Sequence, residues 1–400
     1  MNIILFDSKV KIHLLPLTFT RPVAEVIAGM DTITKKWKRY FENVSFLSPD
    51  YMKAVFGTNI SSDNILIDGS IIPNKELVES LKSLKTNQSF ENKDGDIIAA
   101  RLSKEQLDEV FYFEEFLDLS KLKLSVVKNN IEYKSISRPW HIFSMANELI
   151  NEDFIFKTNS HKSMPIPDSN RFVKKENIFI EEGAVVEFSI LNASNGPIYI
   201  SKNAEIMENC VIKGPFYLGE NSTLKIGCKI YGPTSIGAHC KVGGEVNNSV
   251  FFNYSNKAHD GFIGNSVIGE WCNLGADTNN SNLKNTYDIV KLWSYASNGF
   301  DSTGLQFCGL IMGDHCKCGI NTMFNTGSVI GVSCNLFGDG FHRNFIPSFS
   351  WGSTAKMSCF PIEKALIVCE KMMERRNVQL SDSVRNMLNH VFKIEQNPKK

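Results

Sequence analysis

One histidine, followed at fixed distances by glycines and an asparagine, is the clearest candidate for chemistry in this chain. The stretch KAHDGFIGNSVIGEWCNLGADT, residues 257–278, contains His259, Gly264, Gly269, Asn273 and Gly275. An imidazole has an ordinary pKa of about 6.5, so it can take up a proton near neutral pH and act as a general base. A histidine in a turn is more often a solvated surface residue. The scaffold that carries His259 therefore decides between these interpretations.

The second half of the chain repeats with a period of six residues. Every sixth residue from Ile200 onward is aliphatic, in the run Ile200, Ile206, Ile212, Leu218, Leu224, Ile230, Ile236 and Val242. Two residues before each lies a register of mostly small residues, and the phase resumes at Ile268 and again at Met312. Neither a helix, with period 3.6, nor a simple strand, with period 2, sustains such a pattern.

A period of six predicts a parallel β-helix of triangular section, in which each side takes six residues. The aliphatic residue points inward, the small residue sits near the corner, and Gly and Asn serve the turns because they tolerate positive φ. Three hexads make a coil, so the fifteen clean hexads predict about five coils. Hexapeptide repeats of this kind resemble the left-handed β-helix.

The repeat also accounts for most of the ten cysteines. Seven of them fall in its inward or small registers: Cys210, Cys228, Cys240, Cys272, Cys316, Cys318 and Cys334. A free cysteine packs as a small hydrophobic residue. We therefore expect reduced thiols in the core rather than disulfides or a metal site.

The first half alternates strand-like and helix-like segments, which favours a mainly parallel, Rossmann-like α/β sheet. Apolar spacing predicts one helix over 23–41, another over 74–85, and two more after residue 360. We expect a shortened α/β domain over 1–137 and a connecting helix and linker over 138–176. The β-helix is expected over 177–343, with an insertion at 279–308, and a helical tail over 344–400.

Charge and hydropathy exclude several classes of protein. Lys plus Arg equals Asp plus Glu at 43 each, so no global charge favours nucleic acid or an anionic membrane. No apolar run approaches the roughly 18 residues of a spanning helix. The apolar start lacks a basic leader and is interrupted by Asp7, so we interpret it as a strand rather than a signal peptide. We expect a cytoplasmic protein.

An α/β domain followed by a hexapeptide β-helix resembles the GlmU-like family, bifunctional sugar-1-phosphate nucleotidylyltransferases and glucosamine-1-phosphate N-acetyltransferases, in a shortened bacterial form. In that family a Lys-Ala-(Gly)-His stretch precedes Asn-[Ile/Leu]-Gly-Ala-Gly-Thr. Here Lys257-Ala258-His259 precedes Asn273-Leu274-Gly275-Ala276-Asp277-Thr278. The resemblance implies acetyl-CoA-dependent N-acetylation of an amino sugar, with acetyl-CoA as co-substrate, in a homotrimer.

The resemblance also implies roles for individual residues. His259 corresponds to the general base and Asn273 to the asparagine that holds the sugar. Lys257, Phe262, Glu245 and Asn247 correspond to substrate-binding positions, and Gly275 and Ala276 to the coenzyme A side. Asn247 stands where the family has a phosphate-contacting lysine, which puts the sugar phosphate in doubt.

The α/β domain resembles sugar nucleotidyltransferases through Leu15-Pro16-Leu17-Thr18, with Arg21-Pro22 in place of Pro-Lys. Thr18 and Arg21, together with Lys11, are the phosphate-binding candidates there. The expected Gly-rich loop is replaced by DSKVKIH, which contains no glycine, and Ser70 stands where the family has a Mg²⁺-binding aspartate. Mg²⁺ is expected only if nucleotidyl transfer is retained; otherwise we expect no metal.

Two alternatives to a single acetyltransferase activity remain open. In the first alternative, the chain is a bifunctional enzyme that also transfers a nucleotidyl group from UTP or dTTP. In the second, it is a non-catalytic sensor or scaffold that binds sugar nucleotides. The zinc site of hexapeptide carbonic anhydrases is not expected, because their close His-x-x-x-x-His pair is missing. The expected partners are a small-molecule sugar phosphate and a coenzyme A thioester, without nucleic acid or membrane.

Overall fold

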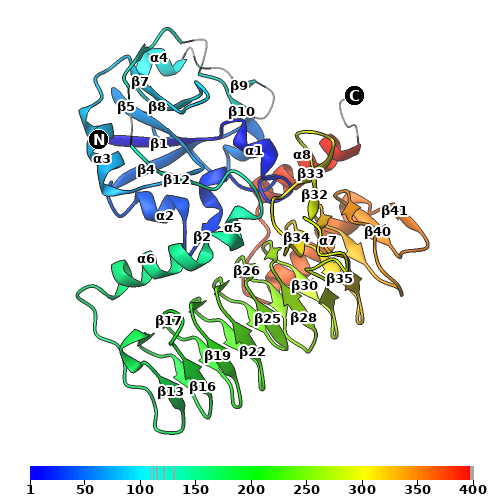
Figure 1. Cartoon of the computed structure of the whole chain (residues 1–400). Coiled ribbons are helices and arrows are strands. Elements are labelled where there is room, and N and C mark those ends of the chain that lie inside the picture. The colour runs from blue at the N-terminus through cyan, green and yellow to red at the C-terminus, as the bar shows by residue number, and fades with distance from the viewer. Residues whose placement is uncertain (109, 111, 114–115, 120–121, 129–130, 397–400) are drawn as a thin grey trace. The chain divides into compact units, whose positions relative to one another are not determined.

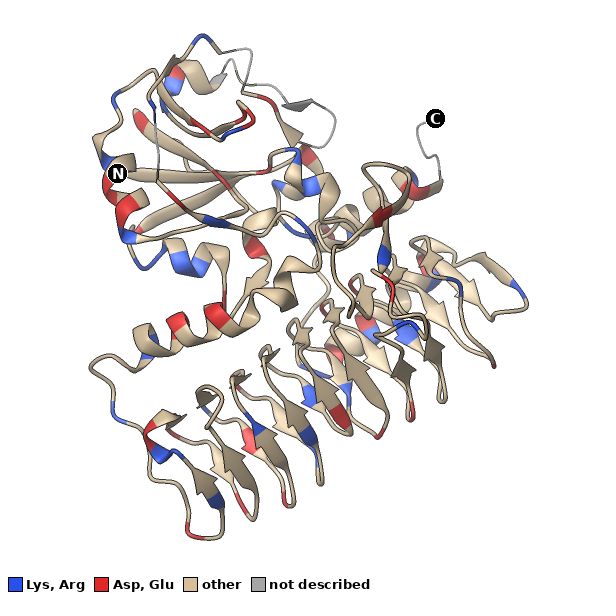
Figure 2. Ribbon diagram, viewed as in Figure 1, with Lys and Arg blue, Asp and Glu red and all other residues tan. Residues whose placement is uncertain are grey.

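The structure, a computed structural model, describes residues 1–108, 110, 112–113, 116–119, 122–128 and 131–396. The chain divides into two compact units. The first comprises Met1–Ile27, Asp31–Arg138 and Ser381–Val391, and the second comprises Ala28–Met30, Pro139–Leu380 and Phe392–Lys400. Figure 2 shows acidic and basic residues interspersed in both units.

The first unit is built on a six-stranded sheet of order β11-β7-β8-β5-β1-β4 (Figure 1). Its strands are β1 (Asn2–Phe6), β4 (Asn43–Leu47), β5 (Asp63–Asp68), β7 (Gln88–Glu91), β8 (Ile97–Ser103) and β11 (Ser125–Val126). Strand β1 is buried along its whole length and pairs in parallel with β4 and β5. Strand β8 runs antiparallel to both β5 and β7, so the sheet is mixed rather than mainly parallel.

Short helices and small strand pairs complete this unit. The helical segments are α1 (Val10–His13), η1 (Val23–Glu25), α2 (Ile33–Trp37), η2 (Asp50–Met52), α3 (Lys75–Ser83) and α4 (Lys104–Asp108). The small pairs join β2 (Ile27–Ala28) to β3 (Asp31–Thr32), β6 (Ile71–Ile72) to β12 (Lys134–Ser135), and β9 (Tyr112–Phe113) to β10 (Phe116–Leu117). The helix predicted over 74–85 is confirmed as α3, whose N-cap Asn74 accepts a hydrogen bond from the Leu77 N–H.

The single helix predicted over 23–41 is wrong. The segment folds as η1, β2, β3 and α2 instead. Gly29 adopts φ +79° and a Cβ there would lie 2.9 Å from Leu149, so the chain turns where the apolar spacing suggested a continuous helix. Thr32 then caps α2, because its side chain accepts a hydrogen bond from the Lys35 N–H.

The second unit contains a parallel β-solenoid with three sheets, whose stacked coils are visible in Figure 1. The first sheet is β13 (Arg171–Val173), β16 (Ile190–Asn192), β19 (Val211–Lys213), β22 (Lys229–Tyr231), β25 (Glu245–Asn247) and β28 (Phe262–Gly264). The second sheet is β14 (Ile178–Ile180), β17 (Ile198–Ile200), β20 (Phe216–Leu218), β23 (Thr234–Ile236), β26 (Val250–Phe251), β29 (Val267–Ile268), β34 (Leu310–Met312), β37 (Ser328–Ile330) and β39 (Phe345–Ile346). The third sheet is β15 (Val185–Val186), β18 (Glu205–Ile206), β21 (Thr223–Leu224), β24 (Lys241–Val242), β27 (Asn256–Lys257), β30 (Asn273–Leu274), β35 (Lys317–Cys318), β38 (Asn335–Leu336), β40 (Ser350–Gly352) and the antiparallel β41 (Met357–Cys359).

The solenoid is held together by the inward registers that the repeat predicts. Its aliphatic residues form one continuous buried cluster from Ile178 to Ile346. All seven cysteines assigned to the repeat are buried and free, as predicted. The corners use residues at positive φ, such as Asn203, Asn221 and His239, so the backbone turns between flat sides. The predicted fold class, an α/β domain followed by a hexapeptide β-helix with terminal helices, is confirmed.

The solenoid is longer than the predicted five coils, because nine strands follow one another in its second sheet. Some coils depart from three hexads. The inward residues Leu218, Ile236, Phe251 and Ile268 occupy one register, yet they are 18, 15 and 17 residues apart. The six-residue phase is therefore lost in the sequence although the inward positions continue.

The insertion at 279–308 contributes β31 (Asn279–Asn280), which pairs with β36 (Met323–Phe324), and the hairpin of β32 (Lys291–Ser294) and β33 (Gly299–Ser302). Helices α5 (His141–Ser144) and α6 (Ala146–Thr158) precede the solenoid, which begins with β13, and η3 (Lys175–Asn177) lies between β13 and β14. The two helices predicted after residue 360 are confirmed as α7 (Ile362–Glu374) and α8 (Asp382–Gln396). Among the described residues, no helix is both long enough and apolar enough to span a membrane.

Candidate functional site

His259 lies in an open groove along one corner of the solenoid. The groove has a volume of about 400 Å³ and is lined by Lys225, Ile226, Gly243, Gly244, Ala258, His259, Asp260, Ala276 and Asp277. These residues follow β21, β24, β27 and β30, four neighbouring strands of the third sheet. Four successive coils thus present the same corner to one groove.

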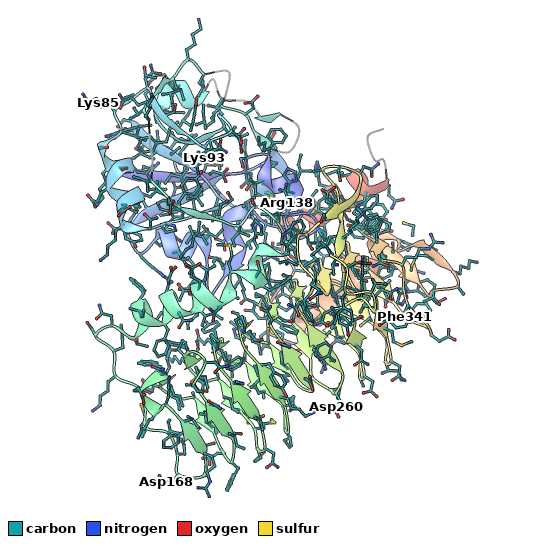
Figure 3. All side chains as sticks on the ribbon, in the orientation of Figure 1. Lys85, Lys93, Arg138, Asp168, Asp260 and Phe341 are labelled. Carbon is teal, nitrogen blue, oxygen red and sulfur yellow. The ribbon has the colours of Figure 1, made fainter. Side chains whose placement is uncertain are left out.

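The groove combines an imidazole with two carboxylates. His259, Asp260 and Asp277 are all exposed, and the His259 ring forms no hydrogen bond with the described residues. Figure 3 shows Asp260 at the outer edge of its coil. Carboxylates attract an ammonium ion, and a nearby imidazole can accept its proton. The arrangement is therefore suited to binding and deprotonating an amine.

The floor of the groove is main chain because glycine occupies it. A methyl group on Gly243 would lie 2.5 Å from the Ala258 carbonyl oxygen. Gly244 adopts φ +71°, and a methyl group there would lie 2.6 Å from the Gly261 carbonyl oxygen. Larger residues would push the coils apart, so glycine permits this close approach. At the floor of the groove a ligand would therefore meet peptide groups, and the side chains of His259, Asp260 and Asp277 would meet it at the walls.

Lys257 lies beneath this floor rather than in the lining. It pairs with Val242 of the preceding coil in the inward register and is 1% exposed. Its Nζ donates to the carbonyl oxygens of His259, at 2.6 Å, and of Asp260, at 3.0 Å. Burial lowers its pKa to about 8, although the neighbouring carboxylates of Asp260 and Asp277 raise it. The amine therefore fixes the corner that carries His259 from inside.

The other predicted site residues lie outside the groove lining, except Ala276. Asn273 is exposed on β30, opposite Asn256. Glu245 and Phe262 are register partners on β25 and β28, beyond the corner. The Phe262 ring covers Gly264 of its own strand, because a Cβ on Gly264 would lie 2.5 Å from the ring.

The remaining two predicted residues lie at contacts between neighbouring coils. Asn247 pairs with Gly264 on the same sheet as Glu245. Gly275 packs against the next coil, where a Cβ would lie 2.4 Å from the Gly319 carbonyl oxygen. Among the charged residues of the groove, sequence reasoning missed Lys225, Asp260 and Asp277. A signal for Asp277 existed, because it replaces a glycine of the family motif; it adopts a positive φ of +54°.

The α/β unit has a cavity of its own, at the carboxyl ends of β1 and β5. It has a volume of about 270 Å³, and its polar lining comprises Ser8, Lys9, Asp68, Ser89, Glu91, Asn92, Asp96 and Asp118. The carboxyl ends of parallel strands are where open α/β sheets bind ligands. Burial raises the pKa of Asp68, although hydrogen bonds from Ser8 and Ser70 lower it. Lys9 and Asp96 form an ion pair with an N–O distance of 2.7 Å.

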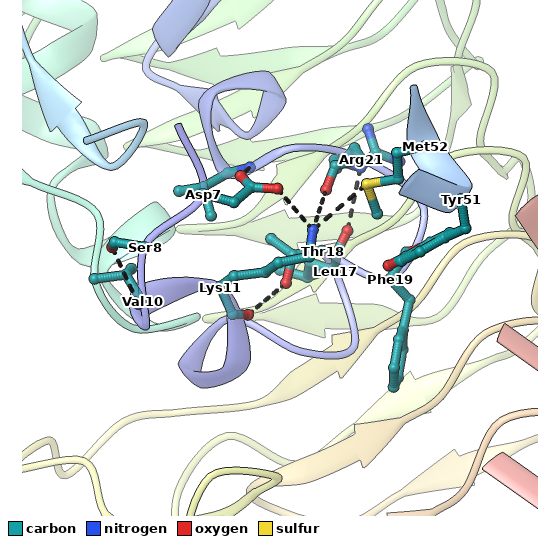
Figure 4. A network of polar contacts seen from close by, with 11 residues as sticks. Asp7, Ser8, Val10, Lys11, Leu17, Thr18, Phe19, Arg21, Tyr51 and Met52 are labelled. Atoms are coloured by element: carbon teal, nitrogen blue, oxygen red, sulfur yellow. Dashed lines mark hydrogen bonds and ion pairs between the residues drawn. The ribbon is translucent and has the colours of Figure 1, made fainter. Parts of the chain in front are cut away.

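A buried network replaces the glycine-rich loop after β1 (Figure 4). Lys11 Nζ lies 2.9 Å from Asp7 Oδ2, and Asp7 Oδ1 accepts a hydrogen bond from the Val23 N–H. Thr18 Oγ1 donates to the Lys11 carbonyl oxygen at 2.7 Å, and Arg21 Nε donates to the Leu17 carbonyl oxygen at 3.2 Å.

The three phosphate-binding candidates of this domain, Lys11, Thr18 and Arg21, are all buried in that network. None of them lines the cavity at the strand ends. Within the described part of the chain, no group of three or more His, Cys, Asp or Glu side chains is placed to hold a metal ion. The described residues therefore do not fit a Mg²⁺ site.

Residues 3–162 match the model of a family described as sugar nucleotidyl transferase. A search of curated proteins finds no match. Among solved structures, a variant of AntD, an N-acyltransferase from Bacillus cereus, contains dTDP-4-amino-4,6-dideoxyglucose and coenzyme A. It is 14% identical over 48% of this chain and 81% of that chain, with a TM-score of 0.19.

Two UDP-N-acetylglucosamine acyltransferases are similarly distant. The one from Campylobacter jejuni is 14% identical over 56% of this chain and 95% of that chain, with a TM-score of 0.21. The one from Arabidopsis is 14% identical over 59% of this chain and 99% of that chain, with a TM-score of 0.20. At such low similarity these structures bear on neither the substrate nor the mechanism of this chain. The chain is therefore similar to sugar nucleotidyl transferases over residues 3–162, which are less than half of its length.

Proposed function

We propose that the solenoid is an acetyl-CoA-dependent N-acetyltransferase whose acceptor is an amino sugar of the glucosamine 1-phosphate type. The observation that carries this proposal is the exposed His259 imidazole in an open groove beside Asp260 and Asp277. The match of residues 3–162 to sugar nucleotidyl transferases supports a sugar or sugar nucleotide as the acceptor.

The groove suggests a role for each residue in the transfer. Asp260 and Asp277 attract the substrate ammonium, and His259 takes its proton. The free amine then attacks the thioester carbonyl, a C–N bond forms, and the C–S bond breaks. The thiolate of coenzyme A leaves and is protonated by the imidazolium, and the acylated nitrogen releases its remaining extra proton to solvent through the regenerated imidazole. Main-chain N–H groups at the corner would stabilise the oxyanion of the tetrahedral intermediate.

The remaining expected contacts belong to the same proposal. Ala276 and Gly275 would adjoin coenzyme A, and Asn273, Glu245 and Phe262 would adjoin the sugar. Coenzyme A would lie between neighbouring solenoids of a homotrimer. Exposed apolar side chains on adjacent strands of the first sheet, at Ile190, Val211 and Tyr231, support association through that face. A single monomeric species in sedimentation velocity at micromolar concentration would exclude the trimer.

Thiol release from acetyl-CoA tests the activity directly. The full chain is assayed with a panel of amino sugars, with and without a 1-phosphate. We expect release with at least one acceptor, and a loss of at least about 100-fold in kcat/KM for His259→Ala, as removal of a general base predicts. His161→Ala is the matched control, because His161 is also an exposed histidine but lies outside the groove.

Each outcome of the assay decides between hypotheses. Release that depends on His259 and not on His161 supports the acetyltransferase. If the wild type and the His259→Ala variant are equally active, His259 is not the general base. No release with any acceptor, together with saturable binding of a sugar nucleotide, supports the non-catalytic sensor or scaffold instead.

Nucleotidyl transfer in the α/β unit is the second candidate function. The family match over residues 3–162 and the cavity at the carboxyl ends of β1 and β5 favour it. Pyrophosphate release from UTP or dTTP with a sugar 1-phosphate tests it, and Asp68→Asn should abolish that release. A wild-type chain that consumes neither nucleotide would remove this candidate.

A further inference from the structure

A further cavity lies at the first coil of the solenoid. It has a volume of about 750 Å³, and its walls come from α6, from the linker over 161–166, and from η3 and β14. All of these segments belong to the second unit. The cavity shares no lining residue with the groove at His259. Its volume lies within the range of small-molecule binding sites.

The linker forms an anchored wall of this cavity, because it pairs with the outer edge of β14. The Met164 N–H donates to the Ile180 carbonyl oxygen at 2.8 Å, and Ser163 Oγ accepts a hydrogen bond from the Ile180 N–H at 2.9 Å. Ile166 is 8% exposed and belongs to the buried cluster inside the solenoid. The cavity is therefore bounded by parts of the chain that are tied to the first coil.

Half of the residues that line the cavity are apolar: Phe154, Met164, Pro165, Ile166, Ile178 and Phe179. Phe179 stacks on Tyr199 with ring centroids 5.1 Å apart, and Phe154 meets the same tyrosine edge-on at 6.3 Å. These contacts hold both phenyl rings in place. Met164 is 45% exposed, so its side chain is open to a ligand. An apolar chain in the cavity would displace water from this surface.

The neutral polar side chains of the lining are already paired. Thr158 Oγ1 donates to the Phe154 carbonyl oxygen at 2.8 Å, and Ser163 Oγ donates to the Met164 carbonyl oxygen at 2.8 Å. A sugar needs polar groups that are free to pair with its hydroxyl groups. The lining therefore favours an apolar ligand over a polyol.

Positive charge gathers around this apolar cavity. Residues 157–176 contain five Lys or Arg and two Asp or Glu, although the whole chain is balanced. Lys162 and Lys175 line the cavity together with His161, and Glu176 is the only carboxylate among the described lining residues. Neither lysine forms an ion pair with the described residues, and both are exposed. The two ammonium groups are therefore available to an anion.

We propose that this cavity binds an anionic amphiphile with a single alkyl chain, such as a fatty acid or an alkyl phosphate. The chain lies against Phe154, Met164 and Phe179, and the anion pairs with Lys162 and Lys175. The chain supplies the apolar contact that exposed lysines lack, and the anion matches the bases that surround the cavity. This site is independent of the proposed acetyl transfer.

Calorimetric titration of the full chain tests the site with four probes, each below its critical micelle concentration: decanoate, decyl phosphate, hexanoate and decanamide. We expect saturable binding of decanoate, decyl phosphate or both. Hexanoate should bind at least about tenfold more weakly, because each lost methylene removes apolar contact. Decanamide keeps the chain without the charge and should also bind at least about tenfold more weakly. Binding of only one long-chain anion distinguishes a carboxylate from a phosphate.

Two variants test the charged and the apolar parts of the site separately. Lys162→Glu/Lys175→Glu reverses the charges at the rim and should weaken binding of the long-chain anion at least about tenfold. Thr158→Trp keeps every charge and places an indole in the cavity, so it should abolish saturable binding. Lys202→Glu/Lys356→Glu is the matched control, because it changes the net charge equally at exposed lysines outside the cavity.

Thermal unfolding shows whether each variant is folded. The long-chain anion should raise the melting temperature of the wild type and of the control, and leave that of Thr158→Trp unchanged. The proposal is overturned by absence of saturable binding by the wild type, by equal binding of decanamide, or by equal binding to either variant in its folded form. Association with phosphatidylglycerol vesicles, without binding of the single-chain anions, would assign the basic surface to a membrane and also overturn it.

Discussion

Each unit of this chain buries a lysine that the sequence offered as a ligand for phosphate or substrate, and the two are accommodated differently. Lys11 in the α/β unit lies against the carboxylate of Asp7, and both side chains are at most 1% exposed. Lys257 in the solenoid has two carbonyl oxygens as its hydrogen-bond partners. The first is a buried ion pair, and the second is a buried amine held by main-chain dipoles.

The two arrangements differ in the free energy that is needed to bury each lysine. Burying an ion pair costs desolvation on both sides, but removing one partner leaves an uncompensated charge. Carbonyl dipoles compensate an ammonium only in part, so Lys257 responds to burial by a lowered pKa. We therefore expect the ion pair to be the more sensitive to mutation, and the amine to be the more sensitive to pH.

Removal of Lys11 should have the largest effect on stability. Lys11→Met leaves the buried Asp7 carboxylate with the Val23 N–H but no cation, which should lower the free energy of unfolding of the α/β unit by about 3–5 kcal/mol. Chemical denaturation measures it. The exposed pair of Lys82 and Glu79 provides the control, and Lys82→Met should cost less than about 1 kcal/mol.

The double variant Asp7→Asn/Lys11→Met sharpens this prediction. It removes both charges and keeps an acceptor for the Val23 N–H, so most of the lost stability should return. A double variant as unstable as Lys11→Met alone would mean that the Lys11 side chain, rather than its charge, holds the loop after β1.

Lys257 should make the stability of the solenoid depend on pH. Its pKa in the folded chain is about 8, below the ordinary 10.5. The unfolded chain therefore binds more protons between these values, and the stability of the solenoid rises with pH across that window. A difference of this size corresponds to as much as about 3 kcal/mol.

The test compares urea unfolding of the wild type and Lys257→Met at several pH values from 7.5 to 10.5. The variant should lack the rise in stability, and its free energy of unfolding near pH 7.5 should change little, because the lost hydrogen bonds are offset by relief of a buried amine. Lys229→Met, at an exposed position on β22, should keep the wild-type pH dependence. Identical slopes for the wild type and Lys257→Met would contradict a lowered pKa.

The same residues show which features of the fold could be predicted from the sequence. The solenoid was predictable because its inward residues recur in sixes, and repetition outweighs local exceptions. Lys257 was not placed inside, because the coil before it has 15 residues and the phase of six is lost between Val242 and Lys257. Apolar spacing also suggested a helix over 23–41, where Gly29 and the Thr32 cap impose turns that spacing does not register.

The candidate site was predictable at its centre and not at its edges. His259 follows from a motif that is local in sequence. Asp260 and Asp277 share its groove because two coils stack there, a contact that depends on the length of each coil. In the α/β domain, Thr18 and Arg21 fit a family pattern, but the missing glycines leave a loop whose polar groups bond to one another. The motifs identified candidate binding residues, whereas packing determines where the side chains of those residues point.

A comparison of two glycines separates the cost of backbone strain from the cost of a steric clash near Lys257. Gly227 and Gly244 adopt nearly the same φ, +72° and +71°. A methyl group on Gly227 meets nothing within 4 Å, whereas one on Gly244 lies 2.6 Å from the Gly261 carbonyl oxygen and 2.9 Å from Lys257 Nζ. Gly227→Ala should cost about 1 kcal/mol of unfolding free energy from strain alone. Gly244→Ala should cost about 1–3 kcal/mol more.

Introducing Gly244→Ala into a Lys257→Met chain then identifies which neighbouring atom clashes with the added methyl group. In a Lys257→Met chain, the flexible methionine can withdraw, so a clash with the amine would make Gly244→Ala cheaper than it is in the wild type. An unchanged cost would assign the resistance to the Gly261 carbonyl oxygen, which belongs to the neighbouring coil. In that case the floor of the groove is fixed by coil-to-coil contact, and the amine beneath it holds only the corner that presents His259.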